Sequence, residues 1–236
     1  MKRSRTFPLL LAAVAAVAGA ARAERPAAAP TAPSGAVAAS PGAPAAAPDA
    51  AGLLRAIVEA HTAKPAFKMT FVQSYAPAGF PDTTPETGTL TIQAPASLRF
   101  DYDGSEGKVY TFDGKAARQY VAADQQIVLK TLTAAEKARL PLLFLQPAAE
   151  ILDRFAAAAR PAANGLVDLT LTPRAEGDLR SVAALATPTG EIKRLVVLDA
   201  EGNRTTFTFT NRAARKKRPA SDFALVPPKG TRVVGE

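Results

Sequence analysis

Apolar and polar residues alternate along most of this chain, and this pattern constrains the fold more than any other feature. Phe67, Met69 and Phe71 occupy alternate positions, as do Phe100 and Tyr102. A period of two places such residues on one face of a strand and leaves the other face exposed to solvent. Asp-Gly and Asn-Gly pairs between the runs favour tight hairpins. The pattern predicts antiparallel strands at 67–74, 88–93, 98–103, 109–112, 117–121, 126–132, 166–173, 182–187, 192–199, 204–210 and 223–226.

The residues that catalysis and metal binding require are scarce. The chain has no cysteine, which excludes disulfides and thiolate metal sites, and His61 is its single histidine. His61 lies on an apolar helix face, where a packing role is expected. Neither a nucleophile elbow nor a phosphate-binding glycine loop occurs. Asp101, Asp103 and Glu106 fall on the outward alternation and in a turn, where solvation accounts for them. We expect no enzyme, metal or cofactor.

The N-terminus has the layout of an export signal. Residues 1–5 are basic, 7–20 are apolar, and Ala21-Arg22-Ala23 matches the small-x-small cleavage rule. The apolar run is too short for a membrane span, which needs about 20 residues. The sequence predicts a signal peptide at 1–23 and a protein of the periplasm.

Three regions are therefore expected in the chain. After the signal peptide, residues 24–52 are almost entirely Ala, Pro, Gly and Ser, a composition typical of a flexible tether. Residues 53–236 suit one domain. The tether either provides reach or is a neutral insertion.

The net charge of the mature chain argues against nucleic acid as a partner. The formal charge is +8, and loss of Lys2, Arg3, Arg5 and Arg22 with the signal leaves 8 − 4 = +4. This charge is mild and dispersed, and aromatic residues are not interleaved with it, so a nucleic-acid surface is not expected.

Three segments have helical patterns. Residues 53–63 carry apolar residues at helical spacing, and Pro65 ends that pattern. Thr133-Ala-Ala-Glu136 is a capping box, and a further helix is predicted at 148–160. An apolar connection at 140–146 joins these two. The middle helices either fill the open face of the sheet as its core or form a movable lid over an apolar cavity.

Several short motifs follow one another over the predicted domain. In order they are Met69-Thr-Phe-Val-Gln73, Gly88-Thr-Leu-Thr-Ile92, Ala94-Pro95 with Leu98-Arg99-Phe100, Phe112-Asp113-Gly114-Lys115, Leu171-Thr172-Pro173, Leu198-Asp199-Ala-Glu-Gly-Asn203 and Phe223 to Val234. Each is weak alone, but their order resembles the periplasmic outer-membrane lipoprotein carrier proteins, the LolA family. The resemblance implies a mainly β fold, an incomplete antiparallel β-barrel with a helical lid over an apolar cavity.

The resemblance also implies a function and partners. Proteins of this family shield the acyl chains of lipoproteins, taking them from an inner-membrane release complex to an outer-membrane acceptor. Because each CH₂ moved out of water is worth about 0.8 kcal/mol, an acylated anchor needs such a shield to cross water. We expect a monomer and favour the lid interpretation. Two alternatives stay open: a carrier or sensor of another lipid, such as a glycolipid, and a structural protein with a filled core.

Two positions depart from the family pattern. The family's lid-latching arginine directly precedes the proline that ends a strand, and this chain has Ala94 there. We do not transfer that role to Arg99 on the neighbouring strand. Phe100 replaces the family tryptophan and keeps an apolar aromatic side chain.

Alternation and the family lid together predict the residues of the site. The expected lipid-lining residues are Phe71, Leu90, Ile92, Phe100, Tyr102, Leu143, Phe144, Ile151, Leu152, Phe155, Leu195, Val197, Phe207 and Phe209. The densest charge run is expected in the loop before the last strand, as a solvated turn or as a docking patch for an acidic partner or anionic headgroups, and comprises Arg212, Arg215, Lys216, Lys217 and Arg218.

Overall fold

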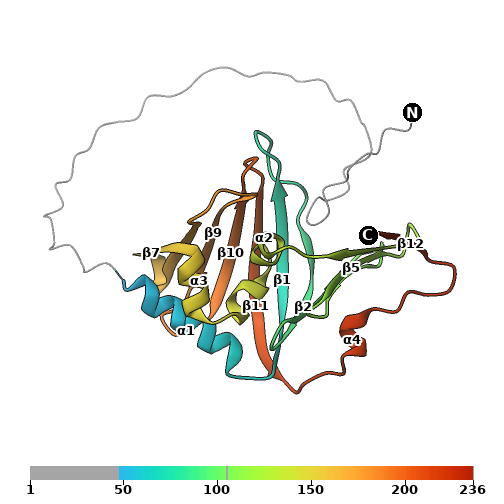
Figure 1. Cartoon of the computed structure of the whole chain (residues 1–236), viewed down its shortest axis with the longest axis horizontal. Helices are drawn as coiled ribbons and strands as arrows, with labels where there is room; N and C mark the ends of the chain where they lie inside the picture. Colours follow the sequence, from blue (N-terminus) through green and yellow to red (C-terminus); the bar gives the residue numbers. More distant parts are fainter. Residues whose placement is uncertain (1–47, 105, 236) are drawn as a thin grey trace, which may run out of the picture.

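A computed structural model describes residues 48–104 and 106–235 of the chain (Figure 1). The predicted signal peptide and all but the last residues of the predicted tether lie outside the described residues. Within them, no helix is both long enough and apolar enough to cross a membrane.

Twelve strands form one open sheet in the order β12-β6-β5-β4-β3-β2-β1-β11-β10-β9-β8-β7. Neighbours pair antiparallel except β12, which lies parallel to β6. The end strands β12 and β7 do not pair, so the predicted incomplete barrel is confirmed as an unclosed sheet. The strands are β1 Ala66–Ala76, β2 Glu86–Gln93, β3 Ser97–Tyr102, β4 Lys108–Phe112, β5 Ala116–Val121, β6 Gln126–Thr131, β7 Phe155–Pro161, β8 Val167–Pro173, β9 Leu179–Ala186, β10 Ile192–Asp199, β11 Arg204–Arg215 and β12 Arg232–Gly235.

The described chain has four α-helices, of which only α1 is longer than two turns. They are α1 Ala50–Thr62, α2 Ala134–Ala138, α3 Ala148–Arg154 and α4 Ser221–Ala224, with 3₁₀ turns η1 Pro141–Leu145 and η2 Ala163–Gly165. Helix α1 begins three residues before the predicted start because Asp49 caps it, accepting a hydrogen bond from the Ala51 amide at 3.0 Å. The capping box predicted at Thr133 and Glu136 opens α2.

The inner face of the sheet carries the core. Alternate residues of β1 are buried, among them Phe67, Met69 and Phe71, and they form one cluster with residues of every strand from β2 to β4 and from β7 to β11. Leu54 and Ile57 of α1 are fully buried against this cluster, together with residues of α2, η1 and α3. Because a single sheet cannot bury its own face, α1 and the middle helices are what make this surface a core.

The predicted helix at 148–160 is wrong in its second half. Helix α3 ends at Arg154, and Phe155–Pro161 forms the edge strand β7, paired in register with β8 from Phe155 opposite Pro173 onward. The alanine-rich sequence has high helix propensity, but pairing with β8 overrides that preference. Phe155 still belongs to the core, contributed by a strand.

The strand predicted at 223–226 is also wrong. Residues Ser221–Ala224 form the one-turn helix α4, and Leu225 follows with a left-handed φ of 37°. Pro227 and Pro228 have no amide hydrogen for a sheet ladder, which disfavours continued pairing. After the Pro-Pro-Lys-Gly segment the chain forms the strand β12.

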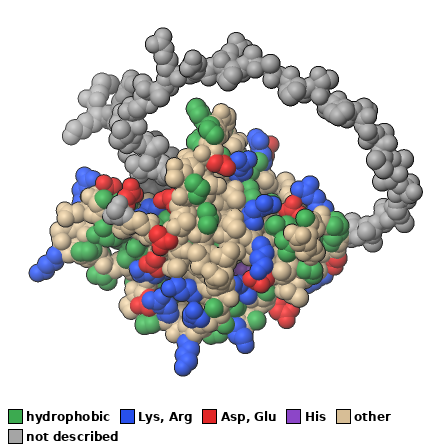
Figure 2. Space-filling model, turned by 180° about the vertical axis from the view of Figure 1, so that it is seen from behind, with side chains coloured by type: hydrophobic (Ala, Val, Ile, Leu, Met, Phe, Trp, Pro, Cys, Tyr) green, Lys and Arg blue, Asp and Glu red, His purple; other side chains and the backbone are tan. Residues whose placement is uncertain are grey.

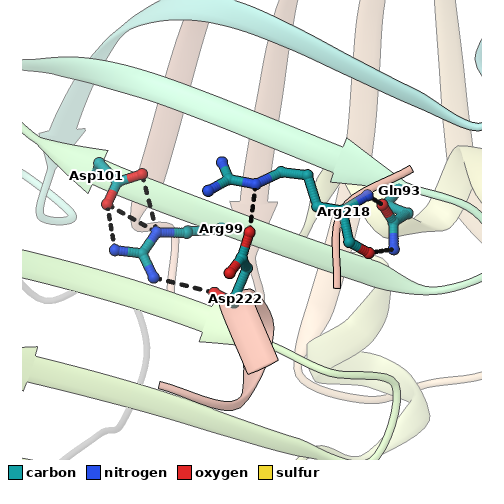
Figure 3. A network of polar contacts seen from close by, with 5 residues as sticks. All are labelled: Gln93, Arg99, Asp101, Arg218 and Asp222. Atoms are coloured by element: carbon teal, nitrogen blue, oxygen red, sulfur yellow. Dashed lines mark hydrogen bonds and ion pairs between the residues drawn. The ribbon is translucent and has the colours of Figure 1, made fainter. Parts of the chain in front are cut away.

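Helix α4 lies on the outer face of the sheet (Figure 3). Alternation turns Arg99 away from buried Leu98 and Phe100, and its guanidinium donates to the backbone oxygen of Asp222 at 3.0 Å. Phe223 is only 1% exposed and lies outside the main cluster. The tail that follows β11 therefore crosses the back of the sheet to add β12 beside β6.

A hydrogen-bond pair holds the start of this crossing. The Gln93 side chain accepts from the Arg218 amide at 2.7 Å and donates to its carbonyl at 3.2 Å. Arg218 also pairs with Asp222 at 2.6 Å (Figure 3). These contacts account for a polar face that the alternation predicted to be wholly solvated.

His61 lies where α1 meets the middle helices. It is 5% exposed, its Nδ1 donates to the Ile57 carbonyl at 2.8 Å, and its ring lies 6.3 Å from that of Phe144. The packing role predicted for it is confirmed. The pKa of His61 is lowered to about 4, chiefly by burial and also by nearby Arg212, while the hydrogen bond to Ile57 and the charge of Glu191 act in the opposite direction.

We predict that stability falls on acidification because of this residue. Unfolded His61 titrates near pH 6.5, while folded His61 titrates near pH 4. Between these values the unfolded chain binds more protons, so the free energy of unfolding decreases as pH falls. The total loss from this residue is about 3 kcal/mol, measured by urea denaturation across the window. In His61→Gln the slope should be much reduced; an unchanged slope would contradict the assignment.

Candidate functional site

An aromatic cluster forms the centre of the inner face. The ring of Phe71 lies 5.2 Å from that of Phe100 and 5.1 Å from that of Tyr102, both edge to face. Phe207 stacks on Phe209 at 6.0 Å and also meets Phe100 at 5.7 Å. Strands β1, β3 and β11 contribute these rings, although they are far apart in sequence, because β1 pairs with β11 and lies one strand from β3.

All fourteen predicted lining residues lie in one place. Twelve are buried members of the core cluster, and Tyr102 and Leu152 pack against it partly buried. The sheet contributes Phe71, Leu90, Ile92, Phe100, Tyr102, Phe155, Leu195, Val197, Phe207 and Phe209, and the helices contribute Leu143, Phe144, Ile151 and Leu152. Their contact with a lipid stays a prediction.

The middle helices α2, η1 and α3, which we call the lid, cover this face mainly through apolar contacts. In η1, Pro141, Leu142, Leu143 and Phe144 are all buried, and no side chain caps this turn. Ile151 of α3 is fully buried as well. The lid side chains thus take the space that an acyl chain would need on the inner face, so this is a closed arrangement.

Few polar contacts tie the lid to its surroundings. Lys130 of β6 pairs with Glu136 of α2, and the Arg139 guanidinium donates to the Asp178 carbonyl in the β8–β9 loop. Within the lid, Arg154 donates to the side-chain oxygen of Gln146. The methyl side chain of Ala94 cannot form a hydrogen bond or ion pair with the lid. The Arg99 side chain lies on the outer face of the sheet, where it bonds to Asp101 and to the Asp222 carbonyl. Sequence reasoning missed Arg139 and Arg154, because only the fold brings them to their partners.

Hollows flank the lid on two sides. A cavity of about 350 Å³ separates it from the β2–β3 and β4–β5 turns, and one of about 380 Å³ separates it from the β8–β9 loop. Ala134 and Arg154 line both. Both volumes fall in the range of small-molecule sites, about 300–1,000 Å³. The two cavities that the lid residues line therefore lie at the margins of the lid.

Polar groups interrupt the inner face near β3 and β4. The Tyr102 hydroxyl donates to Gln73 at 2.7 Å, and Lys108 lies 3.9 Å above the Tyr102 ring and pairs with Glu86. Burial raises the pKa of both Tyr102 and Tyr110. The buried Tyr110 hydroxyl has no hydrogen-bond partner among the described residues. Sequence reasoning did not select Tyr110, although it lies on the inward alternation of its strand.

We call the densest charge run of the sequence the basic segment; it comprises Arg212, Arg215, Lys216, Lys217 and Arg218. Only part of this segment lies in a loop, as was predicted for all of it. Arg212 and Arg215 belong to β11. Arg212 is half-buried, lies 3.6 Å above the Phe67 ring and donates to the Ala60 carbonyl, and burial lowers its pKa. Its role is to join β11 to α1.

Other members of the basic segment face solvent. Arg215, Lys216 and Lys217 are exposed, and none forms an ion pair with a described carboxylate. Figure 2 shows Lys and Arg side chains gathered near the lower edge of the molecule, seen from behind. The described chain has no group of three or more His, Cys, Asp or Glu side chains placed to hold a metal ion.

Comparison with known proteins identifies the family. Residues 63–226, more than half of the chain, match the family described as "Outer membrane lipoprotein carrier protein LolA". The outer-membrane lipoprotein carrier protein of Pseudomonas syringae pv. syringae (strain B728a) is 27% identical over 150 residues, covering 64% of this chain and 72% of that protein. That of Xanthomonas oryzae pv. oryzae (strain MAFF 311018) is 26% identical over 153 residues, with the same coverage of 64% and 72%.

Solved structures are similar only at low identity. A LolA superfamily protein from Nitrosomonas europaea aligns with a TM-score of 0.42 and 11% identity, covering 74% of this chain and 96% of that one. This similarity is too low to support an argument about function. The family match over residues 63–226 shows that this chain belongs to the LolA family of outer membrane lipoprotein carrier proteins.

Proposed function

We propose that this protein is a periplasmic carrier that shields the acyl chains of lipoproteins and moves them from an inner-membrane release complex to an outer-membrane acceptor. The observation that supports this most is the large apolar inner face of the sheet, which is covered by a lid whose apolar side chains pack against it. If the lid moves away, acyl chains can take the place of its apolar side chains on the inner face. This exchange leaves no buried charge and no unpaired backbone group there. The work is binding and release, with no bond made or broken.

Opening the lid breaks a few polar contacts. The polar side-chain contacts that join the lid to the sheet and its loops in the described chain are the partly buried Lys130–Glu136 pair, the Arg139 bond to the Asp178 carbonyl and the Arg174 bond to the Leu152 carbonyl. A hydrogen bond to a charged group contributes about 1.5–3 kcal/mol. The apolar surface that a moving lid uncovers adds to this cost, and lipid acyl chains would cover it again. Cargo therefore supplies the free energy that keeps the lid open.

A second candidate function is a carrier or sensor for a different lipid, such as a glycolipid. The unpartnered Tyr110 hydroxyl favours it, because a buried donor without a partner costs about 1–3 kcal/mol and a polar headgroup would satisfy it. Saturated acyl chains offer no such group. The two candidates share the lid and differ in what is found bound.

Locking the lid should stop loading. Ala96 in the β2–β3 turn and Ala134 of α2 both line the 350 Å³ cavity, and the chain has no native cysteine. In Ala96→Cys/Ala134→Cys, a bismaleimide with a cleavable disulfide joins lid to sheet. We expect loss of uptake of a triacylated lipopeptide, followed by displacement of a polarity-sensitive dye, and recovery after reduction.

The single variant Ala134→Cys, treated in the same way, is the matched control and should load normally. Full uptake by the cross-linked double variant would show that acyl chains do not enter beneath the lid. Failure of both proteins to take up lipopeptide before cross-linking would exclude the lipoprotein carrier and leave the second candidate.

The three exposed cations of the basic segment should contribute to docking at the release complex. Neutralising Arg215, Lys216 and Lys217 to Gln should weaken binding to the reconstituted complex roughly tenfold or more, since each cation near an acidic surface is worth about 1 kcal/mol. The difference should shrink as salt screens the charges.

A charge-matched control changes three dispersed exposed residues, Lys115, Arg180 and Lys229, to Gln. Arg212 and Arg218 stay unchanged because the fold uses both. An equal loss of binding affinity in the two triple variants would show that net charge alone accounts for the effect. Unchanged binding of the Arg215/Lys216/Lys217 variant would refute the docking patch.

A further inference from the structure

The 350 Å³ cavity at the lid margin has two chemically distinct parts. Its apolar part includes Pro95 and Ala96 beside the β2–β3 turn, Phe112 of β4 and Leu142 of η1. Its polar part contains two cations, both from the lid: Lys137 of α2 and Arg154 of α3. No carboxylate of the described residues lines it. An apolar surface next to paired cations is the arrangement that an anionic amphiphile requires.

Neither cation has a charged partner in the part of the chain that the structure describes. Lys137 is half-buried, with its Nζ 5.6 Å from the centre of the Phe112 ring. Arg154 is also half-buried; its Nε donates to the Glu150 backbone oxygen at 3.2 Å, and its Nη2 donates to Gln146. Both acceptors of Arg154 are neutral. Half-buried cations without counter-charges are unfavourable in an empty site, and a bound anion relieves that cost.

Two of the carboxylates next to the cavity in sequence are already engaged, and a third, Asp153, lines the neighbouring 380 Å³ cavity and not this one. Asp113, beside lining residue Gly114, pairs with Arg118 at 2.6 Å and accepts two backbone amides at 2.9 Å. Glu136, beside Lys137, pairs with Lys130 and accepts the Thr133 amide of the capping box at 2.9 Å. Moving either to the cavity would break these contacts. The counter-charge is therefore expected from outside the chain.

We propose that this cavity binds a single-chain anionic amphiphile, with its carboxylate or phosphate between Lys137 and Arg154 and its chain along the apolar wall. Arginine and lysine both form charge-assisted hydrogen bonds with such groups. This goes beyond the proposed transport function, because the acyl groups of a lipoprotein anchor are uncharged esters and amides. The head group would join α2 to α3, while the chain contacts the sheet, so the ligand favours a closed lid.

Isothermal titration calorimetry with decanoate, decyl phosphate and decanol below their critical micelle concentrations tests the proposal. The wild-type protein should bind at least one anion tenfold or more tightly than the alcohol. Lys137→Gln and Arg154→Gln should each weaken anion binding by about tenfold or more, because hydrogen bonds to charged groups exceed neutral ones in strength. Decanol binding should change little in either variant.

Lys115→Gln is the matched control. Lys115 is exposed in the β4–β5 turn, next to lining residue Gly114, but does not itself line this cavity. Its substitution should leave anion binding unchanged, whereas a loss equal to that of Lys137→Gln would move the ligand out of the proposed cavity and overturn the assignment. Tighter decanoate would indicate a fatty acid, and tighter decyl phosphate a lysophospholipid-type head group.

Two results contradict the site itself: decanol binding as tightly as both anions, or wild-type anion affinity in both cation variants. Lipopeptide uptake, measured in the same variants, keeps this test separate from the proposed function. We expect Lys137→Gln, which removes none of the polar contacts that hold the lid, to retain uptake while losing the anion. Cation-dependent anion binding in a protein that takes up no lipopeptide would support this site and refute the carrier.

Discussion

The fold depends on covering the inner face of an open sheet. The twelve strands of the described chain form an open sheet, and its inner face is one continuous apolar surface. Because the sheet does not close into a barrel, other elements must cover that surface. Helix α1 and the lid bury that surface with aliphatic side chains, at about 25 cal/mol for each Å² removed from water. In the proposed function the same surface would receive acyl chains, so stability without cargo and binding of cargo would draw on the same side chains.

The lid and α1 divide this work unequally. Helix α1 is tied down by Leu54, Ile57 and His61, and the Arg212 guanidinium bonds to its last turn. The lid instead consists of three short elements, with η1 uncapped and only partly exposed polar ties at its ends. Short elements with few polar ties open at lower free energy than a long capped helix. In the proposed function, α1 would be the fixed support and the lid the part that moves.

Much of this architecture was predictable from the sequence, for a physical reason. A period of two fixes which face of each strand is buried, so the inner positions of β1, β3, β10 and β11 were identified without the structure. What alternation lacks is information about partners. The sequence of β7, Phe-Ala-Ala-Ala-Ala-Arg, has helical propensity and becomes a strand only because β8 lies beside it. Phe223 was read as part of a strand because it is apolar, whereas it is buried on the outer face by contacts with residues over a hundred positions away. The same limitation hid the cations of the lid: the roles of Lys137 and Arg154 depend on a cavity whose other wall comes from the β2–β3 and β4–β5 turns.

The central claim is that the inner face exists to hold lipid carried through an aqueous compartment. Native mass spectrometry of the protein purified from its own cells, followed by identification of bound molecules, tests this most directly. The account predicts a fraction of the protein in one-to-one complex with acylated lipoproteins. Protein that is found without any lipid, and that also remains empty when offered a triacylated lipopeptide, would contradict it and leave a structural protein with a filled core.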